Sequence, residues 1–350
     1  DLSRSFDSYW NNERAYPVQS LVTREELQSM RERAKKADQE LVEQAARDHD
    51  DPPRDDAPPT AEQRARAWDE KPLDLRTAAF VWAPAVMLAD KPGKIPADSG
   101  PDTAKAPGLV VSQPDDKPAT SRGAASLEAA SDLAANGDTV VEGLLQLIGQ
   151  ARSSLLIISP YFVPGKDMLK AFGEARARGV SIRVLTNSLA SNDAPVAHVG
   201  YARHRETLLR MGIELYELRS EQSSFGNVFG SSGGSGGVTG QSRAMLHSKV
   251  LVMDGRLLVV GSMNLDLRSQ LQNTEIALLI RSDELSRAAS AQIERGMSER
   301  SWHVELKDGA LVWRAPAGSG LKDATSEPDT SASLRLMLKL FGPLAPDQLL

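Results

Sequence analysis

Hydrophobic and polar positions follow one pattern before about residue 139 and a different, more regular pattern after it. From Thr23 to Asp48, apolar residues recur every three or four positions in a charged run, which predicts an amphipathic helix. An acidic, proline-rich linker follows, and after it come a short helix around residues 61–69 and an apolar segment at 78–89. Residues 96–138 are rich in Ala, Asp, Ser and Pro, so we expect a disordered, low-complexity insertion there.

From residue 139 onward, patterns typical of strands and of helices alternate. Thr139 and Glu142 have the spacing of a capping box, which predicts that a helix begins there. A Gly- and Ser-rich stretch at 223–241 is typical of a flexible loop, and Asp254-Gly255 between two apolar runs predicts a β-hairpin. The apolar runs predict strands at 154–159, 181–187, 213–218, 243–253, 256–262 and 274–280, and helices at 166–178, 195–211 and 283–298. This alternation predicts an α/β sheet covered by helices, in a domain that extends from 139 to 315.

The charge and composition of the chain restrict its partners. Lys and Arg number 41 against 47 Asp and Glu, which gives a net charge of −6. Because a protein that binds a polyanion by counterion release needs a basic surface, nucleic acid is not favoured as a partner. Cysteine is absent, which excludes disulfides and thiolate metal ligands. The most apolar stretch, residues 80–89, is too short for the roughly 20 residues that cross a bilayer, so we expect no transmembrane helix.

The stretch with the most informative chemistry is MLHSKVLVMDGRLLVVGSMN, residues 245–264. His247 and Lys249 are two positions apart on a predicted strand, so their side chains leave the same face. Ser262 and Asn264 lie beyond the partner strand, and the hairpin brings both pairs toward one end of the sheet. A neutral imidazole can attack phosphorus, while an ammonium and a carboxamide stabilise the charged oxygens. The spacing therefore predicts a phosphate-handling site.

Two carboxylates near this motif each have two interpretations. Glu275 is at the head of the next apolar strand, where it could hold the second imidazole nitrogen of His247 and fix its tautomer. The alternative for Glu275 is a solvated charge at the end of a strand. Asp254 could orient the site, but Asp-Gly is also a good turn sequence, so a purely structural role stays open.

The segments HSKVLVMD and GSMN resemble the HxKxxxxD…GSxN signature of the phospholipase D superfamily. Residues 159–165, 184–218 and 264–280 further resemble the bacterial cardiolipin synthases, particularly the C type. The resemblance covers most of residues 139–315 and implies a phospholipase D-like α-β-α sandwich, with a mixed sheet flanked by helices. It implies no metal and no other cofactor, because side chains stabilise the charge. The catalytic residues that it implies are His247, Lys249, Asp254, Ser262, Asn264 and Glu275, and the implied substrate-binding residues are Tyr161, Asn187 and His198, the last with capping or packing as the alternative.

The enzymes that this sequence resembles bring two copies of the motif together. One histidine forms a phosphoenzyme, and the other protonates the leaving oxygen. This sequence contains the motif once. Residues 6–11 resemble a stretch that follows the first copy, so we expect residues 1–95 to be the remainder of a half whose motif is missing here. The missing N-terminal half, or a second copy of this chain, would then complete the active site.

The resemblance implies a cardiolipin synthase that transfers phosphatidyl groups, with phosphatidylglycerol as substrate and phosphatidylethanolamine as a further candidate. A single-motif homodimeric phosphodiesterase or nuclease is one alternative, and a catalytically incomplete phosphate-binding fragment is another. We expect a peripheral protein of the bacterial inner membrane, on a side that the sequence leaves open. In the tail, residues 316–350, Arg335 and Lys339 lie one helical turn apart among leucines, which suits either a membrane interface or a helix packed on the body.

Overall fold

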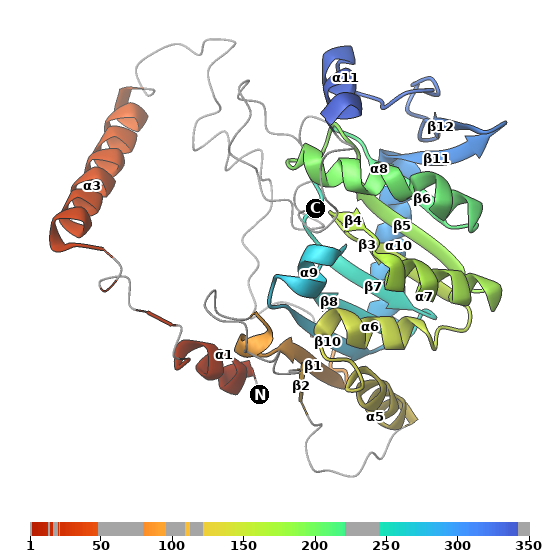
Figure 1. The fold of residues 1–350 in the computed structure, drawn as a ribbon, viewed down its shortest axis with the longest axis horizontal. Coiled ribbons are helices and arrows are strands. Elements are labelled where there is room, and N and C mark those ends of the chain that lie inside the picture. The colour runs from red at the N-terminus through yellow and green to blue at the C-terminus, as the bar shows by residue number, and fades with distance from the viewer. Residues whose placement is uncertain are drawn as a thin grey trace. The chain divides into compact units, whose positions relative to one another are not determined.

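The chain divides into two units, whose helices and strands are labelled in Figure 1. One unit comprises residues 2–80 with 238–240, and the other, which we call the sheet unit, comprises residues 81–237 and 241–350. The sheet unit contains every strand found in the described part of the chain. The computed structural model describes residues 2–12, 15–16, 20, 22–47, 80–95, 109–112, 122–220 and 245–341.

The N-terminal unit contains helix α1 (Leu2–Trp10) and helix α3 (Arg24–Arg47). Helix α3 begins at a capping box, in which Thr23 Oγ1 accepts from the backbone N–H of Glu26 at 3.2 Å. The Glu26 carboxylate accepts in return from the N–H of Thr23 at 2.8 Å. The amphipathic helix predicted to start at Thr23 is thus confirmed. The short helix predicted at 61–69 and the Gly/Ser loop predicted at 223–241 lie outside the described residues.

The described strands form one large mixed sheet and one small ribbon. The large sheet has the strand order β12-β11-β6-β5-β3-β7-β8-β10-β1-β2. β5 pairs parallel with β3 and β6, whereas all other neighbours in this order are antiparallel. The predicted α/β fold with a mixed sheet is thus confirmed. The strands are β1 (Ala85–Asp90), β2 (Leu109–Val111), β3 (Ser154–Ile158), β5 (Ser181–Asn187), β6 (Glu214–Leu218), β7 (Lys249–Met253), β8 (Leu257–Gly261), β10 (Ile276–Arg281), β11 (Ser301–Lys307) and β12 (Ala310–Arg314), with the parallel ribbon of β4 (Phe162–Val163) and β9 (Leu265–Asp266).

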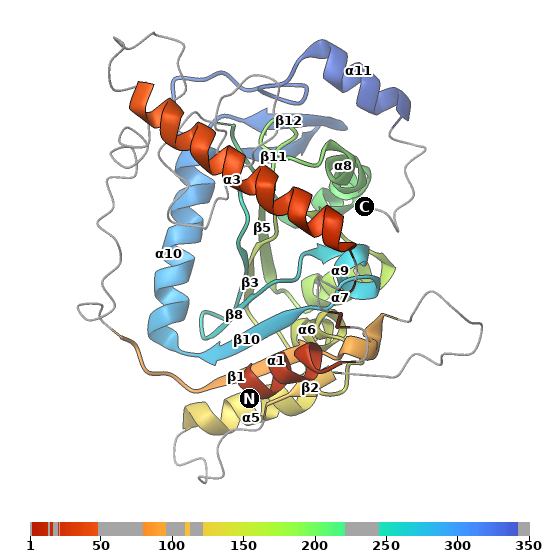
Figure 2. The ribbon, with the colours of Figure 1, turned by 90° about the vertical axis from the view of Figure 1, so that its left-hand side faces the viewer.

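Helices cover both faces of the large sheet (Figure 2). Helices α5 (Arg122–Ala134), α6 (Val140–Ile148), α7 (Lys166–Ala177) and α8 (Pro195–Arg210) lie on one face, and α10 (Asp283–Arg300) lies on the other. Each face therefore has its own hydrophobic core. Leu127, Phe172 and Tyr201 join one core, while Ile293 and Met297 of α10 join the other. The remaining helices are the short η1 (Pro92–Lys94), α9 (Leu267–Leu271) and α11 (Ala332–Phe341).

Part of the region predicted to be disordered is folded. Residues 96–138 contain strand β2 and helix α5, so the expectation of disorder is wrong for these two elements. Leu127 and Ala134 on α5 are buried in the core, and the abundance of Ala that indicated low complexity also favours a helix. The apolar segment at 78–89 contributes β1, which pairs with β10. The large sheet thus includes strands that precede the predicted boundary at 139.

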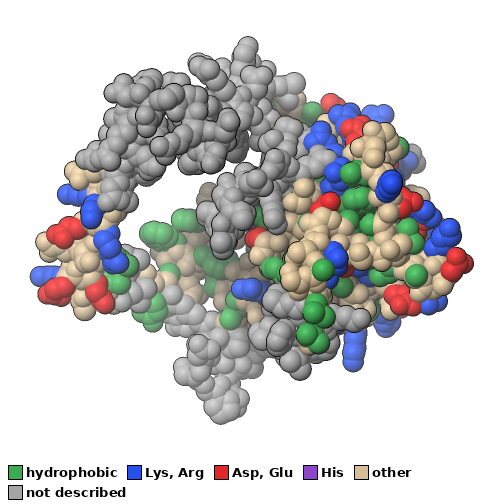
Figure 3. All heavy atoms as spheres, turned by 90° about the horizontal axis from the view of Figure 1, so that it is seen from above, with side chains coloured by type: hydrophobic (Ala, Val, Ile, Leu, Met, Phe, Trp, Pro, Cys, Tyr) green, Lys and Arg blue, Asp and Glu red, His purple; other side chains and the backbone are tan. Residues whose placement is uncertain are grey.

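The surface of the sheet unit mixes the two signs of charge. On the face shown in Figure 3, Lys and Arg side chains are interspersed with Asp and Glu over the described residues. On this face, the described residues form no continuous basic stripe. Among the described helices, none is both long enough and apolar enough to cross a bilayer.

Candidate active site

The candidate active site lies at one edge of the large sheet, where β3, β5 and β8 end and where β7 and β10 begin. Antiparallel pairing of Lys249 with Gly261 puts the start of β7 beside the end of β8. Gly261 also pairs with Ala277, which adds the start of β10 to the same edge. The last residue of β3, Ile158, pairs with Val250 of β7. The hairpin thus gathers the histidine, lysine, serine and asparagine of the motif at one edge, as the sequence predicts.

His247 lies just before β7, and its side chain is exposed. The strand predicted from residue 243 begins only at Lys249, since residues 245–248 belong to no helix or strand. The imidazole makes no hydrogen bond to any residue that the structure describes. Partial burial and the Lys249 ammonium lower the pKa of His247 below its ordinary 6.5, and Asp193 opposes them. The lowered pKa favours the neutral ring, the form in which its nitrogen can act as a nucleophile.

Lys249 is nearly buried beside His247, with 9% of its surface exposed. Its Nζ donates to the carbonyl oxygen of His247 at 2.7 Å. Burial lowers the pKa of this ammonium, while the carboxylates of Glu275, Asp266 and Asp193 act in the opposite direction. An ammonium has three donors, and this one uses a single donor on the described residues. The remaining donors can bind an anion.

Glu275 does not contact the imidazole, contrary to the prediction. Its carboxylate accepts hydrogen bonds from Ser262 Oγ and from Asn273 Nδ2, the latter at 3.3 Å. Only 7% of Glu275 is exposed, so it is not a solvated strand-end charge either. β8 lies between β7 and β10, which places Ser262 next to Glu275 and His247 two strands away. Glu275 therefore fixes the serine hydroxyl and contributes negative charge near Lys249.

Asn264 follows β8, and its backbone N–H donates to Ser269 Oγ at 3.0 Å. Its side-chain oxygen is buried and has no hydrogen-bond partner among the described residues. Leaving a buried polar atom unpaired costs about 1–3 kcal/mol, part of which a bound ligand would recover. Rotation of the carboxamide exchanges its oxygen and nitrogen, so the group can present a donor to a phosphate oxygen. This arrangement fits the implied role of Asn264 in holding a phosphate.

Asp254 lies at the opposite edge of the sheet, in the turn between β7 and β8. Its carboxylate accepts from the backbone N–H groups of Arg152, Ser153 and Ser154 and from Ser153 Oγ. Burial alone would raise the pKa of Asp254, but the hydrogen bonds from Ser154 and Ser153 outweigh it and lower the pKa. The residue has a φ of 52°, the left-handed conformation that this tight turn requires. These contacts fit the structural interpretation of Asp254.

The implied substrate-binding residues Asn187 and Tyr161 both lie at the site edge but make internal contacts. Asn187 is buried and bonds both backbone polar groups of Leu246, contacts that do not fit the implied substrate-binding role. Tyr161 is half-buried, and its hydroxyl donates to Asp193 Oδ1 at 2.6 Å. Burial and this carboxylate raise the pKa of Tyr161 well above 10.0. Tyr161 is therefore a neutral donor at the site edge.

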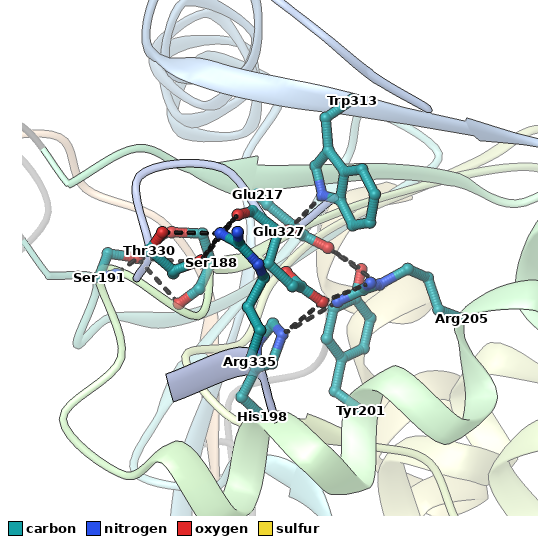
Figure 4. A network of polar contacts seen from close by, with 10 residues as sticks. All are labelled: Ser188, Ser191, His198, Tyr201, Arg205, Glu217, Trp313, Glu327, Thr330 and Arg335. Atoms are coloured by element: carbon teal, nitrogen blue, oxygen red, sulfur yellow. Dashed lines mark hydrogen bonds and ion pairs between the residues drawn. The ribbon is translucent and has the colours of Figure 1, made fainter. Parts of the chain in front are cut away.

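His198 lies in a buried polar network (Figure 4). Its Nε2 is 3.3 Å from Glu327 Oε1 and 3.0 Å from Arg205 Nη2. Arg205 also pairs with Glu217, whose Oε1 is 3.1 Å from Nε. These contacts fit the packing alternative for His198 better than the implied substrate-binding role. The reason is that Glu327, more than a hundred residues further along the chain, covers the first turn of α8.

Sequence reasoning missed the acidic residues that complete the site edge. Asp90, at the end of β1, accepts from the backbone N–H groups of Val140 at 2.8 Å and Glu275 at 2.9 Å. It also pairs with Lys94 at 2.6 Å. Asp266 on β9 is largely buried, which raises its pKa to about 6. Their position in the sequence could have revealed them, because a carboxylate at the end of an apolar run lies at the edge of the sheet where that strand ends.

Among the described residues, no group of three or more His, Cys, Asp or Glu side chains is placed to hold a metal ion.

Residues 144–297, which contain the whole motif, match the family model described as cardiolipin synthase, PLD-like domain. This part of the chain, just under half of its length, is therefore similar to the phospholipase D-like domain of cardiolipin synthases.

Curated relatives and solved structures show the extent of the similarity. Cardiolipin synthase C of Escherichia coli (strain K12) is 35% identical over 208 residues, which are 59% of this chain and 43% of that protein. Cardiolipin synthase A of Yersinia pseudotuberculosis serotype O:3 (strain YPIII) is 31% identical over 179 residues, 51% of this chain and 31% of that protein. The chain thus spans less than half the length of these relatives. A crystal structure of Nuc from Salmonella typhimurium, a phospholipase D family member, is similar with a TM-score of 0.34 at 20% identity, covering 46% of this chain and 88% of that one.

Proposed function

We propose that the edge around His247 is one half of the active site of a phosphatidyltransferase of the cardiolipin synthase kind. One observation carries the proposal: an exposed imidazole lies beside a nearly buried ammonium, at the same sheet edge as a carboxamide whose buried oxygen has no hydrogen-bond partner among the described residues. A phosphodiester bound there meets the reactive ring of His247 and, on its oxygens, the donors of Lys249 and Asn264. Transfer through a phosphohistidine needs these three kinds of group.

The proposed reaction uses two histidines. First, an imidazole nitrogen bonds to phosphorus, the bond from phosphorus to the leaving oxygen breaks, and the other imidazolium gives that oxygen its proton. Then the hydroxyl of a second lipid attacks phosphorus, its proton passes to the second imidazole, and the nitrogen–phosphorus bond breaks. His247 takes one of these two roles. The other histidine comes from a second motif or from a second copy of this chain.

We propose phosphatidylglycerol as the substrate, with phosphatidylethanolamine as a further candidate and cardiolipin as the product. The support is that the two relatives described above are cardiolipin synthases, and that the net charge of −6 does not favour a polyanion. A single-motif homodimeric phosphodiesterase or nuclease would instead need a dimer for activity. A catalytically incomplete fragment would bind phosphate without turnover.

Helix α11 supports a peripheral location, which we propose at the bacterial inner membrane. Leu336 and Leu340 are 59% and 62% exposed and lie one helical turn apart. Arg335 is not directed to a lipid surface, since its Nη1 donates to the carbonyl oxygen of Thr330 at 2.7 Å. The exposed leucines are therefore the candidate contact with lipid. Changing both leucines to Ser should weaken sedimentation with phosphatidylglycerol vesicles about tenfold or more, and unchanged binding would contradict this surface.

Trapping the phosphoenzyme tests the catalytic proposal. The complete protein is mixed with phosphatidylglycerol carrying radioactive phosphorus and is quenched in alkali, which preserves phosphohistidine. If His247 is the nucleophile, His247→Ala loses the protein-bound label; if it is the acid, the label forms but cardiolipin production falls about 10²- to 10⁴-fold. The matched control is His303→Ala on β11, which is remote in the strand order from the hairpin and should keep the wild-type rate. Cardiolipin formation at the wild-type rate in His247→Ala would overturn the proposal, and activity restricted to dimers would favour the single-motif alternative.

A further inference from the structure

The large sheet does not hold His247 directly. β7 begins at Lys249, and residues 245–248 belong to no helix or strand, so the ladder with β8 stops short of the histidine. Among the described residues, the carbonyl oxygen of His247 accepts a hydrogen bond from Lys249 Nζ, which is also the proposed phosphate ligand. A reacting group that moves by about 1 Å can lose about 10²-fold in rate. Another group must therefore fix the backbone beside His247.

The carboxamide of Asn187 makes this connection. Its Oδ1 accepts from the backbone N–H of Leu246 at 2.9 Å, and its Nδ2 donates to the Leu246 carbonyl oxygen at 3.2 Å. The side chain thus pairs with both backbone polar groups of one residue, as a neighbouring strand does. Asn187 is 1% exposed and Leu246 is 4% exposed. Because water does not reach these groups, it cannot replace either hydrogen bond.

Asn187 is itself held at the end of β5. Its Nδ2 lies 3.4 Å from the carbonyl oxygen of Pro160, the residue before Tyr161. Ser191 Oγ, in the loop after β5, donates to Asn187 Oδ1 at 3.4 Å. One carboxamide therefore joins the segment after β3, the loop after β5 and the start of the motif.

We propose that Asn187 is a positioning residue, which holds His247 in place for reaction through the backbone of Leu246. This role rests on the proposed phosphatidyl transfer at His247. A carboxamide is suited to it because it carries a donor and an acceptor side by side. Leucine has a similar shape without either group, and an ionised aspartate would place a negative charge against the Leu246 carbonyl oxygen.

A substrate-free measurement tests the contact. Amide hydrogen exchange at Leu246 is compared in the wild-type protein, in Asn187→Leu and in Thr186→Val. Thr186 is the matched control, because it is equally buried and its Oγ1 bonds the Pro160 carbonyl oxygen at 3.2 Å but makes no bond to Leu246. Protection of the Leu246 amide should be lost in Asn187→Leu and kept in Thr186→Val. Unchanged protection in Asn187→Leu would overturn the proposal.

A second variant covers the case in which Asn187→Leu does not fold. Asn187→Asp keeps the volume of the side chain, and its carboxyl regains a donor when it is protonated. Protection of the Leu246 amide, corrected for the intrinsic exchange rate, should therefore rise as the pH falls through the pKa of the new carboxyl. Protection that stays constant with pH would contradict the two-bond contact.

The activity measurement separates positioning from general damage. Asn187→Leu should lower kcat about 10²-fold with little change in KM, since Lys249 and Asn264 still bind the phosphate. Thr186→Val should keep nearly the wild-type kcat, and an equal fall in that variant would refute the positioning role. If the wild-type protein makes no cardiolipin while the Leu246 amide responds as expected, the proposed function fails and the contact stands.

Discussion

The site edge around His247 and the buried network around His198 contain the same kinds of side chain in opposite states. Each has a histidine, a buried cation and carboxylates. At the site edge the imidazole is exposed and the Lys249 ammonium makes one hydrogen bond to the described residues. In the buried network, Arg205 is 2% exposed and pairs with both Glu217 and Glu327.

The electrostatics of the two regions differ accordingly. Burial lowers the pKa of Lys249, and nearby carboxylates only partly offset this effect. Burial also acts to lower the pKa of Arg205, but the carboxylates of Glu217 and Glu327 outweigh it and raise the pKa above its ordinary value. The rings of Tyr201 and Trp313 lie 4.9 Å and 5.1 Å from the guanidinium carbon and add cation–π attraction. A buried cation with two partners stabilises the fold, whereas one with unused donors is available to a ligand.

Removing the cation of the buried network should give the largest effect. Arg205→Met leaves Glu217, which is fully buried, without the cation that pairs with it, so the free energy of unfolding should fall by about 3–5 kcal/mol. Urea denaturation measures the change. The control Arg210→Met removes an exposed pair with Glu206 and should cost less than about 0.5 kcal/mol. Equal losses in the two variants would remove the contrast between the regions.

The same substitution at the site edge should act on rate and not on stability. Lys249→Met removes an ammonium that burial disfavours, so the free energy of unfolding should change by less than about 1 kcal/mol. The rate of phosphatidyl transfer should fall about 10²- to 10³-fold, because charge on the phosphoryl oxygens loses its main counter-charge. Product assays and denaturation on the same preparation measure both. A large loss of stability with an unchanged rate would contradict the assignment.

Asp254 belongs to the motif but should behave like a residue of the buried network. Asp254→Asn weakens its hydrogen bonds from Arg152, Ser153 and Ser154, and the free energy of unfolding should fall by about 1–3 kcal/mol. The pKa of Asp254 is lower in the folded protein than its ordinary 3.8. The difference from wild type should therefore be present above about pH 4 and disappear as the pH falls through the folded pKa. A difference that does not depend on pH would show that the charge is irrelevant.

The smallest effect is expected from a neutral substitution at the rim of the buried network. Burial alone would raise the pKa of Glu327, but Arg205 and His198 lower it to about 2. Glu327→Gln keeps an acceptor for Arg205 and loses the charge, so the free energy of unfolding should fall by about 1 kcal/mol. Thermal denaturation measures the change, and the rate of transfer should be unaffected. A fall in rate with normal stability would place Glu327 in the catalytic machinery.

The sequence predicts the sheet and the hairpin because the patterns that specify them lie within short stretches of the chain. Alternating apolar runs give the strands, and the Asp254-Gly255 turn gives the register of β7 against β8. From that register, the grouping of His247, Lys249 and Asn264 at one edge follows by geometry. The resemblance to a known family adds the chemical roles, which no pattern of hydrophobicity contains.

The predictions fail where a contact joins segments that are far apart in the chain. His198 meets Glu327, and Asn187 meets Leu246, through tertiary packing that no local pattern encodes. Glu275 has the right strand position, but β8 separates it from His247, and only the complete strand order shows this. The folded residues within 96–138 were missed because alanine is compatible with both low complexity and a buried helix.

Strand β7 gives a physical reason for the number of residues between the lysine and the aspartate of the motif. Lys249 starts the strand at one margin of the sheet, and Asp254 follows its last residue at the other, tied to the beginning of β3. Five residues at about 3.4 Å each cover about 17 Å, so the spacing from lysine to aspartate matches the length of the strand between the two edges of the sheet. One inserted or deleted residue, with Asp254 still anchored, would turn the ammonium of Lys249 to the reverse side. The number of residues between Lys249 and Asp254 is thus fixed by the length of the strand. An insertion or deletion there should be as damaging as replacing one of the motif residues.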